Sequence, residues 1–256
     1  MNPICHLGLT TGQDAKVEKA KLQSLKGAIS GNFTVSDFLS LKTSTGAIIT
    51  NITMLNTAST NRNKPTAVSV TSERGEIDTY LSLFTFDSED HGRSTSGGSF
   101  LVDTRSYTSP INVKFHEAPL NSSLTVASKT IISPIEVSLP RTFEGRFFSS
   151  SGINLPPIGV RGLIDDPSGQ NRTAVFNWNS TRTHGGLLGL GGLMSGDITW
   201  GSEETLDRGL VELKSLLFHP LVSVYRPRPK VGPHYSFIDR DSILQMFREE
   251  EEEDEW

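Results

Sequence analysis

The stretch "GAISGNFTV" at residues 27–35 recurs nineteen residues later as "GAIITNITM" at 46–54 and once more as "GEIDTYLSL" at 75–83. In the aligned copies the apolar positions all have the same parity along the chain; they are Ile29, Phe33, Val35, Ile48, Ile52, Met54, Ile77, Leu81 and Leu83. Successive side chains of a β-strand point to opposite faces, so positions of one parity line one face. The repeat therefore predicts strands with one apolar face and one mostly polar face.

A second alternating run precedes each later copy at a fixed distance. Two leucines lie nine and seven residues before Ile48, and two valines lie at the same distances before Ile77. The pattern continues, with proline in place of glycine, in "SPINVKF" at 109–115 and "SPIEVSL" at 133–139. A unit of strand, polar turn and strand cannot bury its apolar face alone, so it has to stack on its neighbours.

The sequence therefore predicts an all-β fold, in which short strands stack as a β-solenoid or β-helix-like body, or in a sandwich-like one. Isoleucines at equivalent positions should be buried, namely Ile29, Ile48, Ile77, Ile111 and Ile135, with Asn32, Asn51 and Tyr80 outside. The inner face should narrow at the small residues Gly31, Thr50 and Thr79. Glycine before each strand suits a tight turn with positive φ. A phosphate cradle is disfavoured, because no helix and no P-loop lysine follows these glycines.

Composition and charge divide the chain into four segments: an N-terminal segment at 1–23, a β-repeat domain at 24–218, a proline-rich linker at 219–238, and a short helix with an acidic disordered tail at 239–256. Residues 13–23 are expected to form a short polar helix. The tail sequence "EEEEEDE" at 249–255 carries −7 of a formal net charge of −5, so the rest of the chain carries +2. A nearly neutral body without a basic stripe disfavours nucleic acid as a partner.

The search for chemistry gives no catalytic residue, no cofactor site and no metal site. Cys5 is the single cysteine, so no intrachain disulfide can form. The six histidines lack the spacing of metal ligands, and the G-x-S-x-G elbow of hydrolases is absent. The acidic clusters "DSED" at 87–90 and "DDPSG" at 165–169 lack EF-hand spacing and are interpreted as turns rather than calcium sites.

Five N-x-[ST] sequons occur, at Asn32, Asn51, Asn121, Asn171 and Asn179. The first two occupy the same place on the polar side of their repeats, where glycosylation is sterically feasible. No apolar run is long enough to span a bilayer, and the first residues lack the pattern of a secretory signal. The expected location is therefore cytoplasmic for the chain as written, and the cell surface if the chain is exported or is a fragment. Glycans are expected only in the second case.

The units "LKTSTGAIITNITML", "VTSERGEIDTYLSL" and "LPRTFEGRFFSS", followed by "DDPSG" and "SGDITWG", resemble an uncharacterised fungal β-repeat domain. That domain is related in pattern to bacterial putative-adhesin domains with T-S-x-G-x-I repeats. The resemblance covers roughly residues 24–214 and implies a right-handed stack or sheet of short strands with an adhesive or scaffolding role, and no catalytic residues. The chain departs from the pattern in its proline-containing units, after residue 218, and in the glycine-rich stretch at 185–196, which is expected to be a flexible loop.

Two classes of function remain open from the sequence. The first is a non-enzymatic β-repeat protein with an adhesin-like or scaffolding role, whose partner is an unknown protein or glycan. An intracellular scaffold whose acidic tail binds a basic partner is a variant of it. The second is a carbohydrate-active β-helix enzyme of the polysaccharide lyase or hydrolase type. Such a lyase needs a cleft in which calcium-binding acids and a basic Lys or Arg converge, and no motif identifies those residues.

Overall fold

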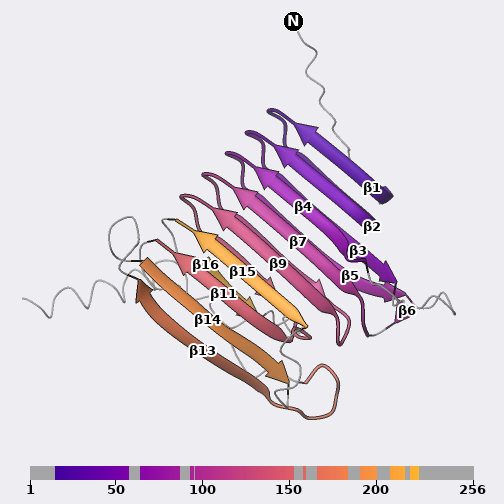
Figure 1. The fold of residues 1–256 in the computed structure, drawn as a ribbon. Coiled ribbons are helices and arrows are strands. Elements are labelled where there is room, and N and C mark those ends of the chain that lie inside the picture. Colours follow the sequence, from indigo (N-terminus) through magenta and orange to yellow (C-terminus); the bar gives the residue numbers. More distant parts are fainter. Residues whose placement is uncertain are drawn as a thin grey trace, which may run out of the picture. The chain divides into compact units, whose positions relative to one another are not determined.

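The computed structural model describes residues 15–57, 64–86, 93–94, 96–152, 158–159, 166–183, 191–200, 208–216 and 220–224 (Figure 1). All regular secondary structure in these residues is β-strand, which confirms the predicted fold class. The chain divides into two units, residues 1–226 and 227–256. The second unit, with the predicted helix and acidic tail, lies outside the described residues, as do Cys5, the cluster at 87–90 and most of the predicted linker.

The strands of the described part are β1 (Ala15–Ser24), β2 (Ile29–Thr43), β3 (Ile48–Thr57), β4 (Thr66–Ser72), β5 (Ile77–Phe86), β6 (Arg93–Ser94), β7 (Ser99–Ser106), β8 (Ile111–Glu117), β9 (Ser123–Thr130), β10 (Ile135–Leu139), β11 (Gly145–Ser151), β12 (Ile158–Gly159), β13 (Ala174–Thr183), β14 (Gly191–Trp200), β15 (Gly209–Ser215) and β16 (Pro220–Val224). They form one sheet in the order β12-β16-β10-β8-β5-β3-β2-β4-β7-β9-β15-β11-β14-β13. β1 pairs with β2, and β6 pairs with β5.

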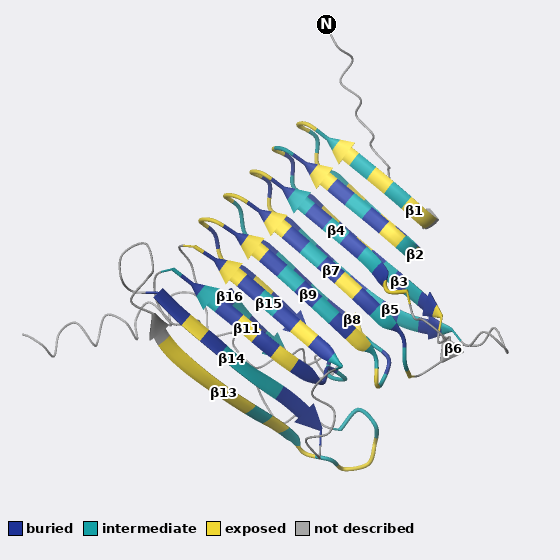
Figure 2. Ribbon diagram, viewed as in Figure 1, coloured by how far each residue is buried: buried dark blue, intermediate teal, exposed yellow. Residues whose placement is uncertain are grey.

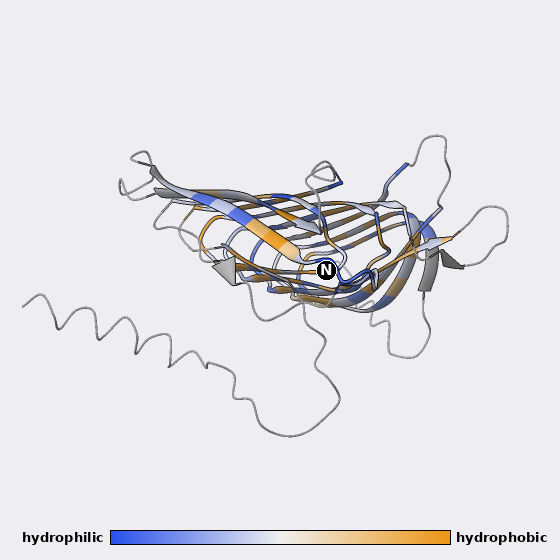
Figure 3. Cartoon of the chain, turned by 90° about the horizontal axis from the view of Figure 1, so that it is seen from below, coloured by the Kyte–Doolittle hydropathy of each residue, from blue (hydrophilic) through white to orange (hydrophobic). Residues whose placement is uncertain are grey.

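The sheet is folded into two layers of strands, which we call faces, and the long strand β2 contributes to both. Its first half, Ile29–Val35, pairs with β3, and its second half, Phe38–Thr43, pairs with β4 on the other side. The chain then alternates between a first face (β3, β5, β8 and β10) and a second face (β4, β7 and β9), always in parallel pairing. One strand of each face makes a coil, and Figure 3 shows the two faces as two layers.

The interior between the faces holds the predicted isoleucine column. Ile29, Ile48, Ile77, Ile111 and Ile135 pair in direct register from coil to coil. The last four are at most 1% exposed, whereas Ile29 is only partly buried because it lies in the first coil. Figure 2 shows the alternation of buried and outward positions along the strands. Full burial of one such side chain stabilises the fold by about 1.5–3 kcal/mol.

The neighbouring inner row is made of small residues, as predicted. Thr50 and Thr79 are buried in register with Gly31, and the two hydroxyl oxygens lie 3.5 Å apart. On the outer side, Asn32 and Asn51 are exposed and Tyr80 is half-buried. The parity of the repeat therefore predicted correctly which side chains of these strands point inward and which point outward.

The turn glycines are required by close stacking of the coils. A Cβ added to Gly46 would lie 2.1 Å from the carbonyl oxygen of Gly27, and one added to Gly75 would lie 1.8 Å from the oxygen of Gly46. The predicted positive φ is wrong, because none of these three glycines has one. Glycine here permits one backbone to approach the next.

A column of Ser and Thr residues begins the turns. In the first three, Ser24, Thr43 and Ser72 accept a hydrogen bond at their side-chain oxygen from the N–H of the glycine three residues later, at 2.8–3.0 Å. Ser106 accepts the equivalent bond, at 3.1 Å, from the N–H of Ser109. A serine, and not the predicted proline, thus stands at the position of the glycine in that unit.

The serine-type turn stacks through its own hydroxyl group. Ser109 Oγ donates to the carbonyl oxygen of Arg74 at 2.5 Å, and Ser133 Oγ donates to that of Thr108 at 2.6 Å. Each bond reaches back to the turn of the preceding coil. The proline that follows each of these serines corresponds to Ala28, Ala47 and Glu76 of the earlier units, because the isoleucines are in register.

The β region is longer at both ends than the predicted domain at 24–218. The helix expected at 13–23 is wrong, because β1 occupies this stretch and packs Ala20 and Leu22 against the core. β16 lies beyond the predicted boundary, at the start of the expected linker. The loop expected at 185–196 is wrong for residues 191–196, which belong to β14, and residues 185–190 lie outside the described residues. Alternation in β1 is weak because its register with β2 shifts between Val17 and Lys19 and because its described core-facing residues, Ala20 and Leu22, are only partly buried.

The last coils are not stacked in chain order. β15 lies between β9 and β11, and β16 lies between β10 and β12 (Figure 1). After β10 the chain therefore skips one coil position, forms β11 and β12, adds β14 and β13 in antiparallel pairing, and then returns to fill the vacant position. We call β15 and β16 the inserted coil.

Candidate functional site

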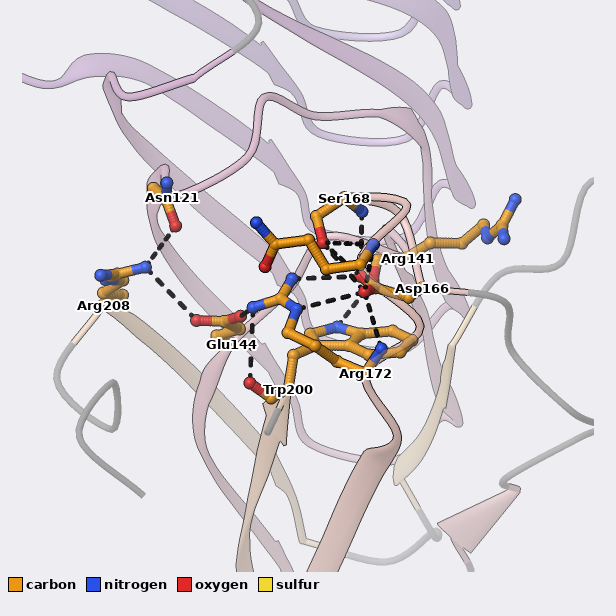
Figure 4. Close-up of polar contacts among 9 residues, drawn as sticks. Asn121, Arg141, Glu144, Asp166, Ser168, Arg172, Trp200 and Arg208 are labelled. Carbon is orange, nitrogen blue, oxygen red and sulfur yellow. Dashed lines mark hydrogen bonds and ion pairs between the residues drawn. The ribbon is translucent and has the colours of Figure 1, made fainter. Parts of the chain in front are cut away.

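The most extensive group of polar contacts in the described part surrounds Arg172, where the start of the inserted coil meets the start of β11 and the end of β14 (Figure 4). Arg172 donates to Asp166 from Nη2 at 3.1 Å and from Nε at 3.3 Å. Its Nη1 lies 3.5 Å from Glu144 and 3.4 Å from the carbonyl oxygen of Trp200. On the other side of Glu144, Arg208 lies 3.4 Å away and also donates to Asn121. We call this group the junction network.

The carboxylate of Asp166 accepts most of its hydrogen bonds from groups of its own loop. Its carboxylate accepts hydrogen bonds from the backbone N–H groups of Ser168, Gln170 and Arg172 at 2.9–3.0 Å. The hydroxyl of Ser168 donates to both carboxylate oxygens. The loop is the predicted turn, since Gly169 has φ of 72° and donates its N–H to the Asp166 carbonyl oxygen.

The electrostatics of the junction network favour a structural role. The hydrogen bonds from the Arg172 side chain outweigh burial and, with those from the Arg172 N–H and from Ser168, hold the pKa of Asp166 well below its usual range. The same pairing raises the pKa of Arg172. The Asp166 and Glu144 side chains are only 2% and 6% exposed. Buried charges that are fully paired position chain segments and offer little to a ligand.

A more accessible site lies on the second face, where strands β4, β7 and β9 end. There an open hollow of about 430 Å³ is lined by Ser69, Thr71, Asp103, Arg105, Ser106, Tyr107, Lys129, Thr130 and Ile131. Its floor is formed by outward side chains of the three strands, and its rim by the turn residues Tyr107 and Ile131, which are 54% and 40% exposed. We call it the turn-end hollow.

A row of basic residues crosses the turn-end hollow from strand to strand. Lys42, Thr71, Arg105, Lys129 and Lys214 occupy consecutive strands in direct register. We call the four charged members, Lys42, Arg105, Lys129 and Lys214, the basic row. A signal for it exists in the sequence, because each of the four immediately precedes a Ser or Thr, which is the last residue of its strand. Only the pairing of the strands aligns them.

The charges around the turn-end hollow are unequally compensated. Arg105 is held by Asp103 of the same strand through contacts of 3.2 Å and 2.9 Å. Lys214 pairs with Glu212 in the same way. Lys129 lies between these two pairs, is exposed, and forms no ion pair with any described residue, although the charge of Glu212 on the neighbouring strand β15 is close enough to interact with it. The residue two positions before it on β9 is Ala127, which has no charge to offer.

A second cluster lies on the outer side of the first face. The rings of Tyr80 and His116 stack with centroids 5.8 Å apart, and Lys114 Nζ lies 5.0 Å from the Tyr80 ring centroid. His116 reaches this position at an irregularity in the β5–β8 register. Lys114 Nζ also lies 3.4 Å from the Tyr80 hydroxyl and 3.9 Å from Asp78. Partial burial lowers the pKa of Lys114, but the interactions with Tyr80, Asp78 and Glu136 together outweigh burial and raise it.

The five sequon asparagines are all exposed, and several have structural roles. Asn121 and Asn171 have φ of 53° and 56°, the left-handed region in which asparagine is enriched among non-glycine residues. Asn51 donates a 2.9 Å side-chain hydrogen bond to Asn32, and Asn179 lies on β13. The five are distributed over the molecule and do not form one site. Their glycosylation stays a prediction.

Comparison with protein families, with curated proteins and with solved structures finds no match for this chain. Within the described residues, no group of three or more His, Cys, Asp and Glu side chains is arranged to hold a metal ion. The same part of the chain has no helix with the length and hydropathy needed to cross a membrane.

Proposed function

We propose that this chain is a non-enzymatic β-repeat protein that presents its outer faces for adhesion or assembly. The observation that carries the proposal is the alignment of outward side chains across coils, because a stack in register repeats similar polar groups at the spacing of the strands. The basic row and the stacked Asn32 and Asn51 are examples. Many weak contacts repeated along one surface give appreciable total affinity for a repetitive partner.

The charged groups of the junction network are bonded to one another and to their own loop, which also supports this proposal. Catalysis by carboxylates needs a group that can accept or release a proton at the working pH. The lowered pKa of Asp166 keeps it ionised, and its acceptor positions are occupied by its own loop. The junction network is where a search for catalytic carboxylates would begin, and the pairing of Asp166 disfavours an acid–base role there.

The test of this proposal compares binding with turnover for the full chain. Immobilised protein is exposed to a panel of polysaccharides and to intact cells, and the same preparation is assayed for depolymerisation of the polysaccharides that bind. We expect saturable binding without product formation. Catalytic turnover of a bound polysaccharide would contradict the proposal.

A second candidate function is a carbohydrate-active enzyme, favoured by the cluster of Tyr80, Lys114 and His116. A tyrosine hydroxyl beside a positive charge is a plausible proton donor or acceptor, and a raised pKa keeps Lys114 charged so that it can stabilise an anion. This candidate predicts that Tyr80→Phe abolishes any turnover while Tyr107→Phe, the same change at the exposed turn, does not. Equal turnover in both variants would contradict it.

A further inference from the structure

The turn-end hollow has the chemical character of a site for a negatively charged sugar. Its one charge without an ion-pair partner among the described residues is the ammonium group of Lys129. The ion pair of Asp103 and Arg105 beside it is held in place by two contacts and still presents further donors and acceptors. The net charge of these three side chains is +1, so the hollow favours an anion.

The other lining groups favour a saccharide over a simple inorganic anion. Ser69 and Thr71 place two hydroxyl groups on the floor, and Tyr107 places an exposed aromatic ring at the rim. A sugar offers hydroxyl groups that pair with the first kind of group, and a C–H face that packs on the second. A carboxylate on the same sugar would accept a charge-assisted hydrogen bond from Lys129.

The basic row extends this arrangement beyond one sugar. Lys42 lies two strands from Arg105 on one side of the hollow, and Lys214 lies on the strand next to Lys129 on the other. Neighbouring strands are about 4.8 Å apart, so positive charge recurs along a line perpendicular to the strands. A linear polymer that carries regularly spaced carboxylates can follow this line.

We propose that the turn-end hollow binds one uronate unit of a linear acidic polysaccharide, which continues along the basic row. Lys129 contacts the carboxylate, the Asp103–Arg105 pair and the hydroxyl groups of β4 contact the sugar hydroxyls, and Tyr107 packs against the ring. The inference rests on the proposed function, and it specifies the partner and the face of the molecule that binds it.

The experiment measures binding of an oligogalacturonate to the full chain by titration calorimetry. Lys129→Gln should weaken binding about tenfold, because it removes a charge-assisted contact. Tyr107→Ala should also weaken it. Lys26→Gln is the matched control, since it makes the same change of charge at an exposed turn of the first coil and should leave affinity unchanged. Thermal unfolding of each variant, followed by circular dichroism, establishes that it is folded.

Three further measurements decide the source of the binding energy. The methyl-esterified oligomer, which lacks the carboxylate charge, should bind the wild-type chain about tenfold more weakly. Equal affinity of the esterified and free acids, or of Lys129→Gln and wild type, would overturn this inference while leaving the proposed function intact. Binding of polyphosphate with the same affinity and the same dependence on Lys129 would also overturn it, because charge alone would then suffice. Turnover of the oligomer would instead contradict the proposed function.

Discussion

At the residue scale, two kinds of residue, glycine and serine, allow the turns to stack closely. Gly46 and Gly75 let successive backbones approach until no Cβ fits between them. Ser109 and Ser133 tolerate a side chain and use it to hydrogen-bond the turn of the preceding coil. The Ser or Thr that begins each of the first four turns serves both kinds, since it accepts the N–H of a glycine or of Ser109.

The glycine turns give the first prediction. Gly75→Ala should lower the free energy of unfolding strongly, because its Cβ would overlap the carbonyl oxygen of Gly46 at 1.8 Å and the backbone cannot yield cheaply. Gly27→Ala is the matched control: its Cβ would meet only Ser24 Oγ, at 3.0 Å. Urea unfolding of both variants measures the difference. Equal stability of the two would contradict the stacking argument.

The junction network gives a prediction about acid. The pKa of Asp166 is lower in the folded chain than its ordinary value of 3.8, so its ionised form stabilises the fold at higher pH. This contribution is complete above about pH 5 and is lost as the pH falls through 3.8 toward the lowered pKa. Asp166→Asn should therefore reduce stability at neutral pH and flatten the loss of stability below pH 4.

The control for the acid prediction is Asp103→Asn, which makes the same chemical change in an exposed ion pair. Exposed pairs contribute little to stability, about 0–1 kcal/mol. Melting temperatures of the wild type and both variants across the acid range provide the measurement. An Asp166→Asn curve parallel to the wild-type curve at every pH would contradict the assignment.

At the element scale, the inserted coil is the least conventional feature of the fold. β15 and β16 are near the end of the described chain, yet they occupy an internal position of the stack with neighbours on both sides. Val211 and Leu213 are fully buried there. β11 is consequently joined to β9 only through β15.

This topology predicts an unequal response to truncation. Ending the chain after residue 207 should destabilise the whole region from β11 onward, because it removes a coil from inside the stack. Removing residues 249–256 should leave the β body folded, because a run of like charges gains little from order. Circular dichroism melts and limited proteolysis of both chains test the contrast. Retention of wild-type protection at β11–β14 in the shorter chain would contradict it.

At the scale of the whole β unit, the first strand limits stacking between molecules. β1 pairs only with β2 among the described strands, so it ends the sheet in that part of the chain. Its outward positions include Lys19 and Lys21, and lysine on an edge strand opposes pairing with another sheet. The apolar face of β1 is small in the described residues, where it consists of Ala20 and Leu22, and its register shifts between Val17 and Lys19, so the stretch gives only a weak strand signal.

We expect Lys21→Val to increase self-association, because it removes charge from the edge strand. Lys42→Val is the matched control, since Lys42 has the same outward direction on β2 but lies between two paired strands. Sedimentation velocity over a range of protein concentrations measures the effect. Comparable self-association of the two variants would show that the edge is not the cause.

The sequence by itself determined the elements whose signal is local. Side-chain parity is a property of each strand, so the positions of Ile48, Ile77 and Ile111, and the outward direction of Asn32 and Asn51, followed from the repeat alone. The turn at Asp166 also followed from local chemistry, because Pro167 fixes its own φ and Gly169 can adopt the positive φ that the turn requires.

Only the tertiary structure decided which strands are neighbours. The turn-end hollow joins residues of β4, β7 and β9, and the basic row needs the register of five strands, so neither exists in any single segment. The inserted coil depends on pairing between residues far apart in sequence, for which no periodicity gives a signal. Backbone hydrogen bonds between parallel strands are the same for every sequence, so burial over the whole stack selects the partners.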